Sequence, residues 1–158
     1  MKNYSAIIGK VRKATKVLSI SPLDEDHRSL LEILRQRSPT PDAPASDWKL
    51  YTSPTLKSGI RMLSRNTIPI AICERDLQPG TWKDLLAKAA LMRHSPLVIV
   101  TSRLADERLW SEVLNLGGYD VLAKPFDATE VIRIIESAWR HWRDHYQSLV
   151  FHALRAAS

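Results

Sequence analysis

The feature that most constrains the fold is the alternation of five short apolar runs with five segments of helical pattern. In the first such segment, Leu30, Leu31 and Leu34 follow the spacing of one helix face. Strands that alternate with helices form a parallel sheet covered by helices on both faces. Continuous apolar runs are typical of such doubly buried strands. The runs are residues 17–20, 48–52, 68–73, 97–100 and 119–123.

Start signals place the helices between these runs. The acidic residues from Asp24 suit a helix N-terminus, where the helix dipole favours negative charge. Ser53-Pro54 predicts the start of the second helix, since proline is favoured in a first turn. Asp127 followed by Glu130 resembles a capping box and predicts a long last helix. The other helices are expected at 82–93 and 105–116, and the proline-rich residues 38–47 form a loop.

Composition favours one soluble domain. The 158 residues are 44% hydrophobic and 25% charged, which is ordinary for a globular protein that buries its own core. The single cysteine, Cys73, lies in an apolar run and excludes a disulfide framework, so a reducing cytoplasm is expected. No segment has the length and apolarity of a signal peptide or a membrane span.

The net charge of +6 is concentrated at the N-terminus. Residues 1–16 contain five basic residues and no acid, which leaves 18 basic and 17 acidic residues in the remainder. A basic tail attracts nucleic acid or anionic lipid, but most charge runs are simply solvated. We therefore expect residues 1–14 to form a basic leader, and we expect neither nucleic acid nor a membrane as partner.

Polar side chains follow several of the predicted strands. Glu74 and Asp76 come after the third run, Thr101 ends the fourth, and Lys124 follows the fifth. In open parallel sheets, ligands bind at the carboxyl ends of the strands. A carboxylate, a hydroxyl and an ammonium group that meet there are suited to holding a phosphoryl group.

Over about residues 15–140 the chain resembles the receiver domain of bacterial response regulators. The resemblance is carried by Thr101-Ser102, by the turn at residues 117–120 and by Lys124-Pro125-Phe126. It implies a flavodoxin-like, doubly wound α/β fold, (βα)5, with a five-stranded parallel sheet. It also implies a role in two-component signalling and a cis bond between Lys124 and Pro125.

The resemblance assigns roles to the strand-end residues. In the family, an aspartate after the third strand accepts a phosphoryl group, and a threonine and a lysine bind the phosphoryl oxygens. Thr101 and Lys124 match the last two positions. The family's acceptor stretch, Asp-Leu-Asp-Leu-Pro-Asp-Gly, aligns with residues 74–80 without a gap, so Glu74 stands at the acceptor position.

Other positions depart from the family. Ser21 and Pro22 replace the two acids that hold Mg²⁺, and Val121 replaces the switch aromatic residue. No cofactor is therefore expected, and Mg²⁺ would bind only if the loop after the first strand is remodelled. The weak candidates for metal ligands there are Asp24, Glu25 and Asp26.

Glu74 has two interpretations that remain open. It either mimics the phosphorylated state or is a structural carboxylate that pairs with Lys124. A gap in the alignment would instead make Asp76 the acceptor. In both interpretations of Glu74 we predict that its carboxylate lies within reach of Lys124.

The function that these residues favour is not enzymatic. We expect an atypical receiver that acts as a signalling protein-interaction module, with a histidine kinase or another signalling protein as partner. The alternative is a phosphorelay receiver that a histidine kinase still phosphorylates on Asp76 or Glu74.

The last helix is longer than a receiver requires. A receiver's last helix ends near Trp139, whereas this one is expected to reach about Arg155, roughly 40 Å in all. Residues 141–158 thus form an extension. An exposed apolar stripe usually marks an interface, so a homodimer is expected, with folding back on the same domain as the competitor. The predicted interface residues are Trp139, Trp142, Tyr146, Leu149 and Val150.

Overall fold

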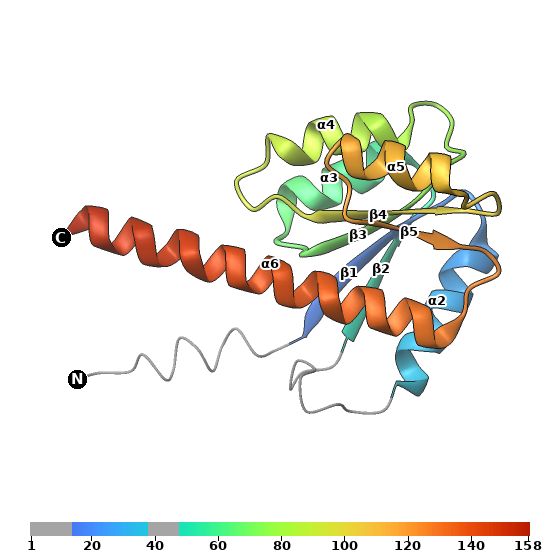
Figure 1. Ribbon diagram of the computed structural model, residues 1–158, viewed down its shortest axis with the longest axis horizontal. Coiled ribbons are helices and arrows are strands. Elements are labelled where there is room, and N and C mark those ends of the chain that lie inside the picture. The colour runs from blue at the N-terminus through green and yellow to red at the C-terminus, as the bar shows by residue number, and fades with distance from the viewer. Residues whose placement is uncertain (1–13, 38–47) are drawn as a thin grey trace.

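The computed structural model describes residues 14–37 and 48–158, which form one five-stranded parallel sheet with helices on both faces (Figure 1). The strand order is β2-β1-β3-β4-β5, the order of flavodoxin-like folds, as predicted. The strands are β1 Thr15–Ile20, β2 Trp48–Ser53, β3 Ile70–Glu74, β4 Leu97–Ser102 and β5 Asp120–Ala123.

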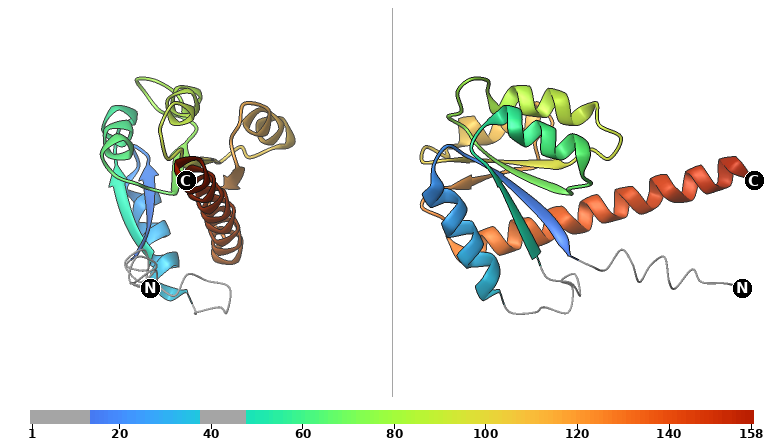
Figure 2. Two further views of the ribbon diagram at one scale, coloured as in Figure 1. Left: turned by 90° about the vertical axis from the view of Figure 1, so that its left-hand side faces the viewer. Right: turned by 180° about the vertical axis from the view of Figure 1, so that it is seen from behind.

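The helices cover the two faces unequally. Figures 1 and 2 show α3, α4 and α5 on one face of the sheet and α2 and α6 on the other. Alternate side chains of β3 point to opposite faces of the sheet. Ala71 and Cys73 pack towards α3–α5, whereas Ile70 and Ile72 pack towards α2 and α6. The helices are α2 Asp24–Gln36, α3 Leu56–Arg65, α4 Trp82–Ala90, α5 Glu107–Asn115 and α6 Ala128–Ala157.

The predicted start of the second helix at Ser53-Pro54 is wrong. Ser53 is the last residue of β2 and is paired in register with Ile20, so the strand continues where a helix was expected. The α3 helix starts at Leu56 because the Thr55 side chain accepts a hydrogen bond from the Ser58 backbone N–H at 3.2 Å. A threonine in this capping position outweighs the nearby proline.

Two further boundaries differ from the sequence prediction. The third strand begins at Ile70 and includes Glu74, so this carboxylate belongs to the sheet rather than to the following loop. The fourth predicted helix, 105–116, is shorter because the Asp106 side chain accepts from the Leu109 N–H at 2.9 Å and starts the helix after itself. The predicted loop at 38–47 and nearly all of the basic leader lie outside the described residues.

Other local predictions are confirmed. The bond between Lys124 and Pro125 is cis, as is the bond between Gln78 and Pro79. The Asp127 side chain accepts from the Glu130 N–H at 2.9 Å and so caps α6 as expected. Across residues 14–37 and 48–158, no helix combines the length and apolarity of a membrane span.

The last helix is much longer than the sheet that it covers. Its buried residues, from Val131 to Ala138, all lie in its first half, against the sheet. Beyond Ala138 no residue of the helix is buried, and its far end extends past the body to Ala157 (Figures 1 and 2). Its 30 residues span about 45 Å at 1.5 Å per residue. The predicted extension is therefore present, two residues longer than expected.

Candidate functional site

The carboxyl ends of the strands carry a buried cluster of polar side chains. Glu74 is the last residue of β3, and Thr101 lies opposite it in the register of β4. Lys124 follows β5, and its backbone N–H donates to the Ser102 carbonyl at 3.0 Å, which continues the sheet by one more bond. Asp26 enters the cluster from the first turn of α2.

Glu74 is the centre of this cluster and is only 5% exposed. Its Oε2 forms an ion pair with Lys124 Nζ and accepts a hydrogen bond from Thr101 Oγ1 at 3.2 Å. Its Oε1 accepts from the Asp76 backbone N–H at 3.1 Å. Both carboxylate oxygens are thus occupied, and the predicted proximity of Glu74 to Lys124 is confirmed.

Asp26 makes the second carboxylate contact with Lys124. Its Oδ2 accepts from Lys124 Nζ at 2.9 Å and from Ser21 Oγ at 2.7 Å. Of the three candidate metal ligands after β1, Asp26 is buried, whereas Glu25 is exposed. Asp24 is also exposed and pairs with Arg28 at 2.8 Å. Only one of the three acids therefore reaches the site, and it does so as the partner of a lysine.

The charge of Lys124 is stabilised by this arrangement. Its side chain is 7% exposed, and such burial lowers the pKa of an ammonium group. The hydrogen bonds and charges of Glu74 and Asp26 act in the opposite direction and outweigh burial, so the pKa of Lys124 is raised. The ammonium group therefore remains charged between two carboxylates at neutral pH.

The loop after β1 is held by His27, a residue that sequence reasoning did not single out. His27 Nε2 lies 3.0 Å from the Ser21 carbonyl oxygen, and Nδ1 lies 2.8 Å from Ser19 Oγ. Because a carbonyl oxygen only accepts, Nε2 carries the hydrogen, and in a neutral ring Nδ1 accepts from the Ser19 hydroxyl. These two bonds, together with that from Ser21 to Asp26, oppose remodelling of the loop.

The donor set of the cluster does not fit Mg²⁺. This ion needs several oxygen ligands in octahedral geometry, usually including one or two free carboxylates. Here Asp26 and Glu74 both bind the ammonium group of Lys124, and a serine hydroxyl stands where the family has an acid. Among the residues that the structure describes, no three His, Cys, Asp or Glu side chains are grouped as for a metal ion.

Asp76, the alternative acceptor, is placed differently from Glu74. It lies in the turn after β3, and its side chain is exposed. Glu74, rather than Asp76, stands beside Thr101 and Lys124. Pro125 follows Lys124 through the cis bond and is exposed. The gap-free alignment therefore agrees with the geometry better than the alignment that slides Asp76 into the site.

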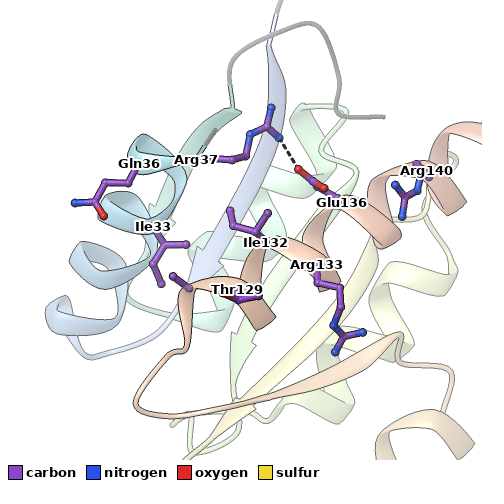
Figure 3. Close-up of a pocket in the computed structure, with 9 residues that line it drawn as sticks. Ile33, Gln36, Arg37, Thr129, Ile132, Arg133, Glu136 and Arg140 are labelled. Atoms are coloured by element: carbon purple, nitrogen blue, oxygen red, sulfur yellow. Dashed lines mark hydrogen bonds and ion pairs between the residues drawn. The ribbon is translucent and has the colours of Figure 1, made fainter. Parts of the chain in front are cut away.

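A separate groove of about 490 Å³ lies between α2 and α6 (Figure 3). Ile33 and Ile132 line it, and the ion pair of Arg37 with Glu136, at 3.4 Å, lies on its border. The Arg37 guanidinium also lies 5.1 Å from the centre of the Trp48 ring. None of the residues around Lys124 line this groove, so the two features are distinct.

The fold is similar to that of solved signal receiver domains. The receiver domain of a putative LuxO repressor protein from Vibrio parahaemolyticus matches with a TM-score of 0.72 and 16% identity. That match covers 87% of this chain and 97% of the other. The receiver domain of an HD domain-containing protein from Pseudomonas fluorescens Pf-5 matches with a TM-score of 0.69 and 19% identity, over 84% of this chain and 99% of that one.

A third similar structure is the beryllofluoride-activated NtrC4 receiver domain dimer, with a TM-score of 0.69 and 17% identity over 81% of this chain and 98% of the other. No model of a known protein family matches the sequence, and no curated protein is similar to it in sequence. The chain therefore has the fold of response regulator receiver domains.

Proposed function

We propose that the chain is an atypical receiver that acts in the cytoplasm as a signalling protein-interaction module. The observation that carries this proposal is the ammonium group of Lys124, held between Glu74 and Asp26. The resemblance assigns the equivalent lysine of the family to binding the oxygens of a transferred phosphoryl group. Here its partners are supplied by the chain itself.

Glu74 supports the mimic interpretation through its contacts. Its carboxylate engages the Thr101 hydroxyl and the Lys124 ammonium group, the two groups that bind phosphoryl oxygens in the family. A glutamate side chain is one methylene longer than aspartate and brings its negative charge closer to where a phosphoryl group would sit. The module would then occupy one permanent signalling state and act by binding a protein partner, such as a histidine kinase.

The proposal is tested with acetyl phosphate and Mg²⁺ at pH 7, followed by the mass of the intact protein. We expect no added phosphoryl group, because the acceptor aspartate and the two metal-binding acids are absent. A regular receiver domain in the same mixture is the positive control. The variant Glu74→Asp is also expected to remain unmodified, since it restores the acceptor without the acids that hold Mg²⁺.

One observation favours the alternative, a phosphorelay receiver. The Asp76 side chain is exposed to solvent two residues beyond Glu74, so burial does not block a kinase from it. If the protein gains one phosphoryl group, Asp76→Asn and Glu74→Gln identify the acceptor. Loss of the modification in either variant would support the phosphorelay function and contradict the proposed one.

A further inference from the structure

The second half of α6 forms an arm, defined here as residues 141–157, that carries an apolar seam. The seam residues follow each other at spacings of four and three, which places them on one face of the helix. Leu149 is 48% exposed, and both alanines of the seam are exposed. The seam consists of Trp142, Tyr146, Leu149, Ala153 and Ala156.

The seam faces the same side as the body of the protein. Trp142 Nε1 donates to the Ser95 carbonyl at 3.1 Å, and Trp142 stacks on Tyr146 with ring centres 5.1 Å apart. The Tyr146 ring in turn meets His94, 5.1 Å away. The predicted folding back therefore applies only to the base of the arm. Beyond Tyr146, the described chain covers none of the seam.

The uncovered part of the arm has almost no charge. From Tyr146 to Ala157, Arg155 is the one permanently charged residue. It lies over the ring of Phe151, 5.8 Å from its centre, on the side of the helix away from the seam. An acidic or basic partner would find no complementary charge here, whereas a second copy of the same arm would meet no like-charge repulsion.

We propose that two copies of the chain pair through their arms in antiparallel orientation. Side-chain size decides the direction. The seam is bulky at Tyr146 and Leu149 and small at Ala153 and Ala156. Antiparallel pairing sets Leu149 against Ala153 of the other copy and Tyr146 against Ala156, so large meets small in every layer. Parallel pairing would set each residue against itself, which leaves gaps between the alanines.

The position of the body points to the same direction. The seam faces the side of the helix on which the body lies (Figures 1 and 2). A parallel partner helix on this seam would run on towards the start of α6. There it would collide with the sheet and with the loop that contains His94 and Ser95. An antiparallel partner ends there instead, and its own body lies beyond the far end of the first arm. Two bodies at opposite ends do not collide.

A second exposed apolar residue supports a partner at this edge. Leu91 is 84% exposed and lies in the same connection, between α4 and β4, as His94 and Ser95. The tip of an antiparallel partner arm arrives beside this connection. The pairing therefore combines the arm seam with a contact to the body, which enlarges the interface between the two copies.

This inference rests on the proposed function in one respect: the second copy of the chain is one partner of the proposed binding module. The seam begins at Trp142, whereas α6 starts at Ala128 beside the strand-end site, so about 20 Å of helix separates the two. Phosphoryl transfer to the native protein would refute the proposed function and leave the pairing intact. A monomeric protein that accepts no phosphoryl group would do the opposite.

The oligomeric state is measured first, by light scattering and sedimentation at tens of micromolar. The native protein is expected to be a dimer, and Leu149→Glu a folded monomer with the circular dichroism of the native protein. Phe151→Glu is the matched control, since Phe151 is at least as exposed as Leu149 but lies on the opposite side of the arm, and this variant should remain dimeric. A native monomer, a dimeric Leu149→Glu or a monomeric Phe151→Glu would overturn the proposal.

The direction is measured with a spin label on Arg133→Cys, an exposed position of α6. In the antiparallel dimer, residue 133 of each copy lies about 50 Å from its equivalent along the helix axis. A distance of about 50 Å between the two labels supports the proposal. Two labels that lie side by side on neighbouring helices would show parallel pairing and overturn it. Cys73 is buried and the pKa of its thiol is raised to about 12, so it does not compete for the label.

Discussion

At the scale of single residues, Lys124 is expected to have a large effect on stability. It is the only cation on the Glu74 carboxylate and on that of Asp26 among the described ion pairs. Lys124→Met would leave two buried carboxylates facing each other without a counter-charge. We expect the free energy of unfolding to fall by about 3–5 kcal/mol, measured by urea denaturation.

An exposed ion pair provides the control for this substitution. Lys83 pairs with Glu112, but both side chains are about half exposed. Lys83→Met should therefore lower the free energy of unfolding far less than Lys124→Met does, because water screens an exposed ion pair. Equal effects of the two substitutions would show that Lys124 is not buried between its carboxylates as described.

The raised pKa of Lys124 also predicts a pH dependence. The folded protein holds the proton more tightly than the unfolded chain, whose lysine has the ordinary pKa of 10.5. The stabilisation is thus complete below that pH and is lost as the pH rises towards the folded pKa. Native protein should lose stability above about pH 10.5 more steeply than Lys124→Met does. Parallel stability curves for the two proteins would contradict this.

Cys73 predicts a chemical property of the folded state. Burial, with a smaller contribution from the neighbouring Glu74, raises the pKa of the Cys73 thiol to about 12. Because the thiolate is the reactive form, native protein should not react with iodoacetamide at pH 8, whereas protein in urea should react fully. Mass spectrometry of the alkylated protein measures both. Rapid modification of the native protein would mean that β3 opens readily.

The sequence predicted the pairing of Glu74 with Lys124 but not the role of Asp26. Glu74 and Lys124 follow strands, and parallel strand ends converge at one edge, so their contact follows from the strand pattern alone. Asp26 comes from a helix, and its acidic neighbours made it look like part of a solvated first turn. Its spacing of four from Leu30 and eight from Leu34, both buried, was the signal that it faces inward.

At the scale of elements, the caps decided the boundaries that the sequence pattern missed. Proline favours a helix start, yet α3 begins where Thr55 can cap it. Thr55→Ala should lower the free energy of unfolding by about 1 kcal/mol, because the Ser58 backbone N–H loses its acceptor. Thr55→Asn, which can also cap, should retain most of the stability. Equal losses in both variants would assign the effect to something other than the cap.

The last helix shows what the pattern could and could not reveal. Its apolar spacing continues without a break from Ile135 through Trp142 and predicted the extension correctly. The contact of Trp142 with Ser95 was not predictable, since nothing in the sequence between α4 and β4 marks that connection as a neighbour of the helix. Such a contact depends on how the helix lies relative to the connections at the edge of the sheet. Apolar periodicity predicts the helix but not its neighbours.

At the scale of the whole molecule, the site and the arm lie towards opposite ends of the sheet. The polar cluster occupies the carboxyl ends of the strands, and the arm leaves the body near their amino ends, where Ser95 precedes β4 (Figure 1). Residues this far apart without shared partners contribute almost additively to stability. Partner binding through the arm and the state of the Lys124 site are therefore expected to be independent.

This independence predicts how thermal unfolding depends on protein concentration. A folded dimer that dissociates on unfolding has a midpoint that rises with concentration, whereas a monomer has a constant one. The midpoint of the native protein should rise between one and one hundred micromolar, and that of Leu149→Glu should stay constant. Lys124→Met should unfold at a lower temperature but retain the same concentration dependence, because its arm is unchanged. Scanning calorimetry measures all three proteins, and a constant midpoint for Lys124→Met would show that the site and the arm are coupled.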